Sequence, residues 1–205
     1  AVKEADGRGI PTIKPWNLEM IKKKIELTKE ANAFAVAMDI DAAGLPFLKN
    51  FTPPAGSKSV EQLREIVELL DVPFIVKGIM TPKAALKAKE AGASAIVVSN
   101  HGGRVLDQCP ATAEVLEDIV KAVDGSMKIF VDGGIRTGVD VFKALALGAD
   151  AVIIARPFVS SVYEGAGEAV KELAEKLKHE LEDTMAMFGA YSLEDISRDM
   201  VSVFK

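Results

Sequence analysis

The chain has 205 residues, of which 49% are hydrophobic, enough to bury one substantial core. Its net charge of -5 and pI near 5.2 give no uniform basic field, so nucleic acid and membrane surfaces are poor partner predictions. The single cysteine, Cys109, excludes an internal disulfide framework and a cysteine-based zinc site, and no apolar run approaches the ~20 residues of a membrane helix. We therefore expect one domain over residues 1–205, located in the cytoplasm and without a metal site.

The first residues, "AVKEADGRG", contain no initiator Met and no signal-peptide core, and are typical of a frayed helix end that runs into a turn. We expect the chain to be the C-terminal part of a longer protein.

Six short apolar runs follow one another along the chain, separated by longer segments of helical pattern. The runs are Ile10 to Trp16, Phe34 to Ile40, Pro73 to Gly78, Ala95 to Asn100, Lys128 to Gly134 and Ala151 to Arg156. Most of them are continuously apolar, as strands covered on both faces must be. This alternation predicts an α/β fold of β/α units around a parallel sheet.

Helix-start residues precede four of the intervening segments: Asn17, Ser59 in the box Ser59–Gln62, Thr81 followed by Pro82, and Thr137. Gly92 and Gly148 are the matching stop signals. Residues 41–58, with three prolines and two glycines, are predicted to be one long irregular loop, and 165–188 a long packing helix.

Polar side chains gather where the predicted strands end, and the strand starts are mostly apolar. The ends carry Asp39, Lys77, Ser99, His101, Arg104, Asp132, Arg136 and Arg156. Because binding sites in β/α architectures lie at the carboxyl ends of the strands, these residues are expected to share one mouth.

The fourth strand runs into "VSNHGGRVLD", residues 98–107, which holds the best candidate for proton transfer. His101 can exchange a proton near neutral pH, and Asp39 is a candidate to orient it. Arg104 offers a fork of donors that suits a carboxylate. The alternative, a structural histidine, is disfavoured by this neighbouring arginine.

The last two strands run into "VDGGIRTG" and "IIARP", which both supply backbone N–H groups and an arginine near a helix start. This combination is typical of a phosphate cradle, although Arg136 and Arg156 could instead be surface ion-pair partners. Lys77, in the apolar "PFIVKG", would be costly to leave unpaired, and a ligand that develops negative charge would offset that cost.

Two long blocks, "PFIVKGIMTPKAALKAKEAGASAIVVSNHGGRVLD" and "VDGGIRTGVDVFKALALGADAVIIARP", closely resemble the FMN-dependent α-hydroxy-acid oxidising family. Glycolate oxidase, lactate oxidase, mandelate dehydrogenase and the flavin domain of flavocytochrome b2 belong to it. The resemblance implies a (β/α)8 TIM barrel with FMN at the C-terminal face. The six runs then match strands 3 to 8, and strands 1 and 2 are missing.

The resemblance also implies a role for each site residue in oxidising a small 2-hydroxy acid. His101 is the base, Asp39 hydrogen-bonds its imidazole, and Arg104 holds the substrate carboxylate. Lys77 lies against the flavin N1/O2 edge, and Ser99 contacts the flavin. The ribityl phosphate is held by a larger set, which consists of Asp132, Gly133, Gly134, Ile135, Arg136, Ala155 and Arg156.

Two departures from the family pattern leave the substrate open. "IPTIKPW" places Thr12 and Lys14 where the family has a Gln and a Tyr, and "DIDAAGLPF" places Pro46 where it has a second arginine. Lys14 could bind the substrate carboxylate in place of that arginine, or sit in a salt bridge; the first is preferred. The electron acceptor and the choice between hydride and carbanion routes also stay open.

Other functions fit part of the pattern. The chain could be an FMN- or phosphate-binding fragment without turnover, or another FMN-barrel enzyme such as a type 2 isopentenyl diphosphate isomerase. A barrel that lacks two units has open sheet edges, so self-association into a homo-oligomer is expected.

Overall fold

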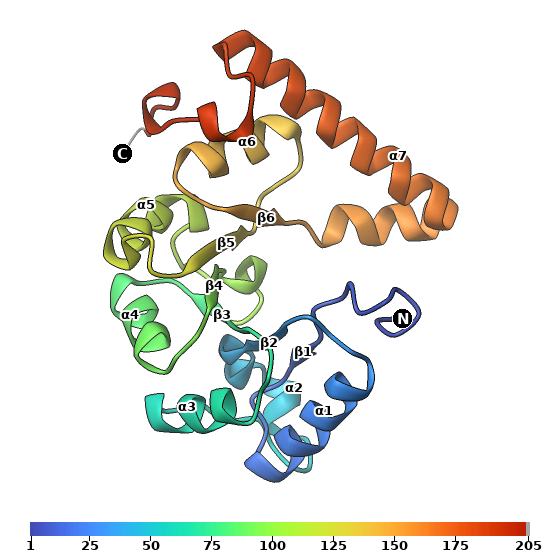
Figure 1. Ribbon diagram of the computed structural model, residues 1–205, viewed down its shortest axis with the longest axis vertical. Coiled ribbons are helices and arrows are strands. Elements are labelled where there is room, and N and C mark those ends of the chain that lie inside the picture. The colour runs from blue at the N-terminus through green and yellow to red at the C-terminus, as the bar shows by residue number, and fades with distance from the viewer. Residues whose placement is uncertain (204–205) are drawn as a thin grey trace.

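In the computed structural model, six parallel strands form one sheet, and their order in the sheet is their order in the chain (Figure 1). The structure describes residues 1–203, except for the side chains of Pro46 and Lys49, so the prediction for Pro46 lies outside the described side chains. The strands are β1 (Thr12–Ile13), β2 (Val36–Asp39), β3 (Phe74–Ile79), β4 (Ala95–Val98), β5 (Lys128–Asp132) and β6 (Ala151–Ile153). The predicted α/β class is confirmed.

The first strand is much shorter than the predicted Ile10 to Trp16. Pro11 and Pro15 flank it, and a proline has no N–H to donate to a neighbouring strand. Pro11 still accepts a hydrogen bond from Ala37 N, at 2.9 Å, because its carbonyl is intact. β1 therefore forms a short edge strand.

Helices connect successive strands. They are α1 (Leu18–Glu30), α2 (Pro46–Lys49), α3 (Val60–Glu68), α4 (Pro82–Glu90), α5 (Thr112–Val123), α6 (Gly138–Ala146) and α7 (Arg156–Phe188), with 3-10 turns η1 (Ile40–Gly44), η2 (His101–Gly103), η3 (Leu193–Asp195) and η4 (Arg198–Met200). The four predicted caps are confirmed: the side chains of Asn17, Ser59, Thr81 and Thr137 each accept a backbone N–H of the first turn.

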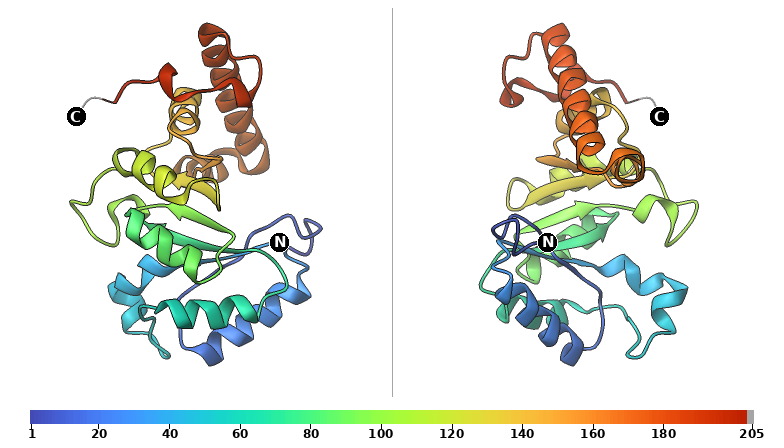
Figure 2. Two further views of the ribbon diagram at one scale, coloured as in Figure 1. Left: turned by 60° about the vertical axis from the view of Figure 1, so that its left-hand side comes forward. Right: turned by 90° about the vertical axis from the view of Figure 1, so that its right-hand side faces the viewer.

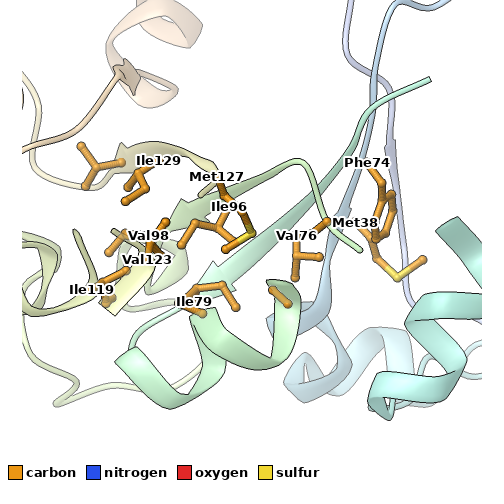
Figure 3. Packing of buried hydrophobic residues seen from close by; sticks show 14 of the residues in the cluster. Met38, Phe74, Val76, Ile79, Ile96, Val98, Ile119, Val123, Met127 and Ile129 are labelled. Carbon is orange, nitrogen blue, oxygen red and sulfur yellow. The ribbon is translucent and has the colours of Figure 1, made fainter. Parts of the chain in front are cut away.

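The core lies between the sheet and the helices that cover its outer face. Figure 3 shows Val98 of β4 near Ile119 and Val123 of α5, and Met38 beside Phe74 at the other end of the same apolar cluster. The other face of the strands carries a smaller cluster, which consists of Ala35, Ala37, Ile75, Ala95 and Val97, with Phe130 packed against it. Both faces are therefore apolar, as the continuous strand pattern predicts.

The segment 41–58 is more ordered than predicted, because it contains α2 and most of η1. Ala42, Leu45, Leu48 and Ala55 pack into an apolar cluster of their own, against Trp16 and Val105. This packing compensates for the prolines and glycines that favour a loop, and it fixes the chain that leaves β2.

The long helix α7 begins earlier than predicted, at Arg156, and is kinked at Gly165 and Ala166. Beyond the kink it packs against α6, as expected for a packing helix; Phe142 and Phe188 stack with ring centroids 5.0 Å apart. The two views in Figure 2 place α7 and α1 at opposite ends of the molecule.

β1 and β6 are the two edges of the sheet, so the six units do not close on themselves. The arrangement is that of six consecutive units of a (β/α)8 barrel, with the remaining part of the circle open. Within residues 1–203, no helix is long and apolar enough to cross a membrane.

Candidate active site

The carboxyl ends of the later strands face a cavity of about 200 Å³. Ten residues predicted for the site line it: Lys77, His101, Arg104, Asp132, Gly133, Gly134, Ile135, Arg136, Ala155 and Arg156. They come from β3, β5 and the turns after β4, β5 and β6, elements that parallel pairing brings to one edge of the sheet. Of the predicted site residues, Lys14, Asp39 and Ser99 lie outside this lining.

Lys77 is the ammonium of the cavity and belongs to a small polar network. Its Nζ lies 3.0 Å from Asp132 Oδ2 and donates to Ser99 Oγ at 2.6 Å. Both charged side chains are more than four-fifths buried, with 18% and 15% of their surface exposed. The predicted need of Lys77 for a negative partner is thus met by a side chain of the chain itself.

His101 is held by contacts to its ring and to its backbone. Its Nδ1 lies 3.0 Å from Asp41 Oδ2, and its backbone N–H donates to Ser99 Oγ at 3.1 Å. The backbone has φ of 57°, a conformation that a non-glycine residue adopts only at a cost of about 1–3 kcal/mol. The two contacts hold the imidazole in a strained turn beside the cavity.

The prediction that Asp39 hydrogen-bonds the imidazole is wrong, because Asp41 makes that contact. Asp39 is 2% exposed, and its Oδ2 accepts a hydrogen bond from Lys14 Nζ. Lys14 is thus found in the salt bridge that was the second of its two predicted roles. The physical reason is competition: the ammonium that follows β1 takes the carboxylate that ends β2, its neighbouring strand.

Asp41 reaches His101 because the chain turns back over β3 immediately after β2. Gly78 of β3 has φ of 102°, and a Cβ built there would be 2.7 Å from Asp41 Cβ and Cγ. Only glycine leaves room for this approach. Sequence reasoning missed Asp41; the signal was the second carboxylate in "DIDAAG", two residues beyond the strand.

Three guanidinium groups, those of Arg104, Arg136 and Arg156, line the cavity. Among residues 1–203, no carboxylate forms an ion pair with any of them; Arg136 Nη1 donates to its neighbour's carbonyl, Ile135 O, at 2.9 Å. A second cavity, of about 530 Å³, adjoins the first and shares Arg156 and Gly133–Ile135 with it. The joined space, lined by glycine backbone and cationic side chains, suits an extended anionic ligand.

Comparison with known proteins agrees with these features. The sequence profile of the FMN-dependent dehydrogenases matches residues 11–203. The chain is 51% identical, over 144 residues, to a peroxisomal (S)-2-hydroxyacid oxidase of Arabidopsis thaliana, in a match that covers 70% of this chain and 39% of the relative. It is 44% identical, over 156 residues, to an L-lactate oxidase of Lentilactobacillus hilgardii, which covers 76% of this chain and 42% of that one.

A solved structure of a mandelate oxidase variant with a monooxide FMN adduct superimposes with a TM-score of 0.82 at 34% identity. The superposition covers 97% of this chain and 65% of that one. The chain therefore spans about two fifths of the length of the curated relatives and about two thirds of this structural neighbour.

Proposed function

Because the chain belongs to the FMN-dependent dehydrogenase family, we propose that it carries the cofactor and proton-transfer site of an enzyme that oxidises a small 2-hydroxy carboxylate to the 2-oxo acid. The observation that carries this proposal is the single cavity onto which His101, Lys77 and the three arginines converge. On this proposal, residues 1–205 are one FMN-binding β/α-barrel domain.

The residues of the cavity fit FMN. Arg136 and Arg156, with the backbone of Gly133 and Gly134, provide the donors that a phosphate needs. Asp132 Oδ1 is buried and has no hydrogen-bond partner among the described residues, which leaves it an acceptor for a polar group of the ligand. When bound, FMN would supply the two-electron acceptor of the reaction.

The chain's own residues would handle the substrate and its protons. Arg104 binds the carboxylate of the 2-hydroxy acid through its planar fork of donors. His101 accepts the proton from the hydroxyl group or from Cα, as the hydride or the carbanion route requires. Lys77 supplies positive charge where negative charge develops, and Ser99 and Asp132 hold its ammonium in place.

The function is tested by anaerobic spectroscopy on the full-length protein loaded with FMN. Addition of glycolate, L-lactate or (S)-mandelate should bleach the flavin absorbance. His101→Ala should keep FMN and slow bleaching by about 10²–10⁴-fold, because the general base is lost. A protein that fails to bind FMN, or a His101→Ala variant that is bleached at the wild-type rate, would contradict the proposal.

A second candidate is an FMN- or phosphate-binding unit without turnover, because the arginines and glycine backbone that line the two joined cavities would hold a phosphate without any substrate. That candidate predicts FMN binding with no bleaching by any 2-hydroxy acid. Self-association through the two free strand edges and a cytoplasmic location stay predictions.

A further inference from the structure

We propose that Asp41 is the residue that positions His101 and stabilises its protonated form, and that Asp39 is withheld from this role by Lys14. The inference rests on the proposed function, since it assigns the partner of the base in that reaction. It goes beyond it by placing the orienting carboxylate on η1, two residues past the end of β2.

The contacts of the imidazole determine which of its two nitrogens carries the proton. His101 Nδ1 and Asp41 Oδ2 are 3.0 Å apart, and the two side chains are 21% and 13% exposed. A neutral imidazole has one donor and one acceptor nitrogen. A carboxylate only accepts, so Nδ1 must carry the proton, and Nε2 is left with the lone pair that a base needs.

The environment of Asp39 explains why this carboxylate does not bind the imidazole. Asp39 lies close to both partners, since ligand-type atoms of Asp39, Asp41 and His101 all lie within 4.8 Å of one another. Its Oδ2, however, is bound to the ammonium of Lys14, which compensates its charge. Of the two carboxylates, Asp41 is therefore the one with a direct bond to the ring and no competing cation among the described residues.

The backbone at Gly78 leaves room for the carboxylate of Asp41. Asp41 can lie at this distance because Gly78 has no Cβ, which would be 2.8 Å from Asp41 Oδ1. Asp41 Oδ1 is itself buried and has no hydrogen-bond partner among residues 1–203, so Oδ2 makes the one bond that holds the carboxylate. The position is thus built for the contact with His101.

Other charged groups around His101 oppose or balance this effect. The groups that share the cavity or the cluster with the imidazole are Lys77 with Asp132, Arg104, Arg136, Arg156, and Asp39 with Lys14. Three of these groups are arginines that have no carboxylate partner among the described residues, and all three disfavour a positively charged ring. Asp41 carries the nearest compensating charge, so its removal should lower the rate of proton transfer to His101.

Nitrogen NMR of the imidazoles tests the assignment without turnover. Residues 1–205 contain two histidines, and His179 lies exposed on α7, so within these residues the ring signals of His101 are assigned with a His179→Gln variant. In FMN-free protein at alkaline pH, His101 should carry its proton on Nδ1, and Asp41→Ala should remove this preference. A wild-type ring protonated on Nε2 would overturn the proposal.

Flavin reduction tests the role of the charge. Asp41→Asn should slow bleaching by the substrate about 10²-fold with little change in FMN affinity, and should move the acid limb of the rate profile to lower pH. Asp41→Glu should recover part of the rate. Asp39→Asn, the same change two residues earlier, should leave both the Nδ1 proton and the acid limb in place.

A backbone variant separates positioning from charge. Gly78→Ala should push Asp41 away and reproduce the loss of the Nδ1 proton, whereas Gly125→Ala, at φ of 68° with open space around it, should not. If Asp39→Asn alters the ring and Asp41→Ala does not, the assignment is wrong. If wild-type protein binds FMN but is not bleached, the proposed function fails, and the NMR result still decides the assignment.

Discussion

The buried pair of Lys77 and Asp132 is the contact between two side chains with the clearest energetic consequence. We expect Lys77→Met to lower the free energy of unfolding by about 1–3 kcal/mol, because it leaves a mostly buried carboxylate without its cation. The matched control is Lys128→Met. Lys128 pairs with Asp150 at 2.6 Å, but its side chain is 71% exposed, so the loss should stay below about 1 kcal/mol.

Urea unfolding of the two variants checks this difference. Equal losses of unfolding free energy in the two variants would show that burial does not make the Lys77–Asp132 pair more stabilising than the exposed pair. Lys77→Met should also weaken FMN binding if the Lys77 ammonium contacts the cofactor. Fluorescence quenching on titration with FMN measures this effect separately.

Most residues of the candidate site could be predicted from the sequence, because a polar residue at the end of an apolar strand lies at the carboxyl edge of a parallel sheet. Lys77, His101 and Arg156 were located in this way and line one cavity. Asp41 was not, since its position depends on a 3-10 turn and on the space above Gly78, and neither leaves a periodic signal. The partner of Asp39 was also unpredictable, because it is set by pairing between neighbouring strands.

The contact between α6 and α7 depends on one glycine. A Cβ at Gly138 would lie 2.2 Å from Leu181 N, and Gly138 N donates to Glu180 Oε2 at 2.8 Å. We expect Gly138→Ala to destabilise the protein by about 1–3 kcal/mol, since backbone cannot move aside as a flexible side chain can. Gly167→Ala, with nothing near its added Cβ, should be neutral or slightly stabilising.

Thermal unfolding compares these two variants. An unchanged midpoint for Gly138→Ala would mean that α7 can shift along α6 without loss of packing.

Helix starts were better predicted than strand lengths. A cap such as Ser59 is a local hydrogen bond to the next turn, so nearby residues decide it. The length of β1 is decided by the neighbouring strand and by two prolines. The kink of α7 lies at Gly165 and Ala166, where the backbone angles leave the helical region.

Several surface carboxylates link the stability of the fold to pH. Hydrogen bonds from Arg198 and then Lys121 hold the pKa of Glu117 below its usual 4.5, and backbone N–H groups of Ser192 and Tyr191 hold the pKa of Asp195 below 3.8. The unfolded chain therefore binds these protons more readily. Their stabilisation is complete above the unfolded pKa values and is lost as pH falls through the folded ones.

Urea unfolding at a series of pH values should thus give a free energy that falls steadily below about pH 4.5. Glu117→Gln, which removes one of these carboxylates and weakens the tie between α5 and η4, should make the dependence shallower. A slope that is unchanged in this variant would assign the acid sensitivity to other groups.

The fold class was predictable because alternating apolar strands and amphipathic helices favour only a few packed arrangements. The (β/α)8 barrel was predicted from the resemblance of two sequence blocks to the FMN-dependent α-hydroxy-acid oxidising family. The open edges at β1 and β6 follow from the same count of six units.

The sheet order, which repeats the order of the strands in the chain, means that every pair of neighbouring strands is also a pair of successive strands. We expect each pairing to require closure only of the segment between the two strands, which keeps the contacts along the sheet comparatively local. The Lys14–Asp39 pair joins the first two strands, whereas Arg156 follows the last one. The Lys14–Asp39 contact thus needs only β1 and β2, while the cavity beside Arg156 needs β3 to β6 side by side.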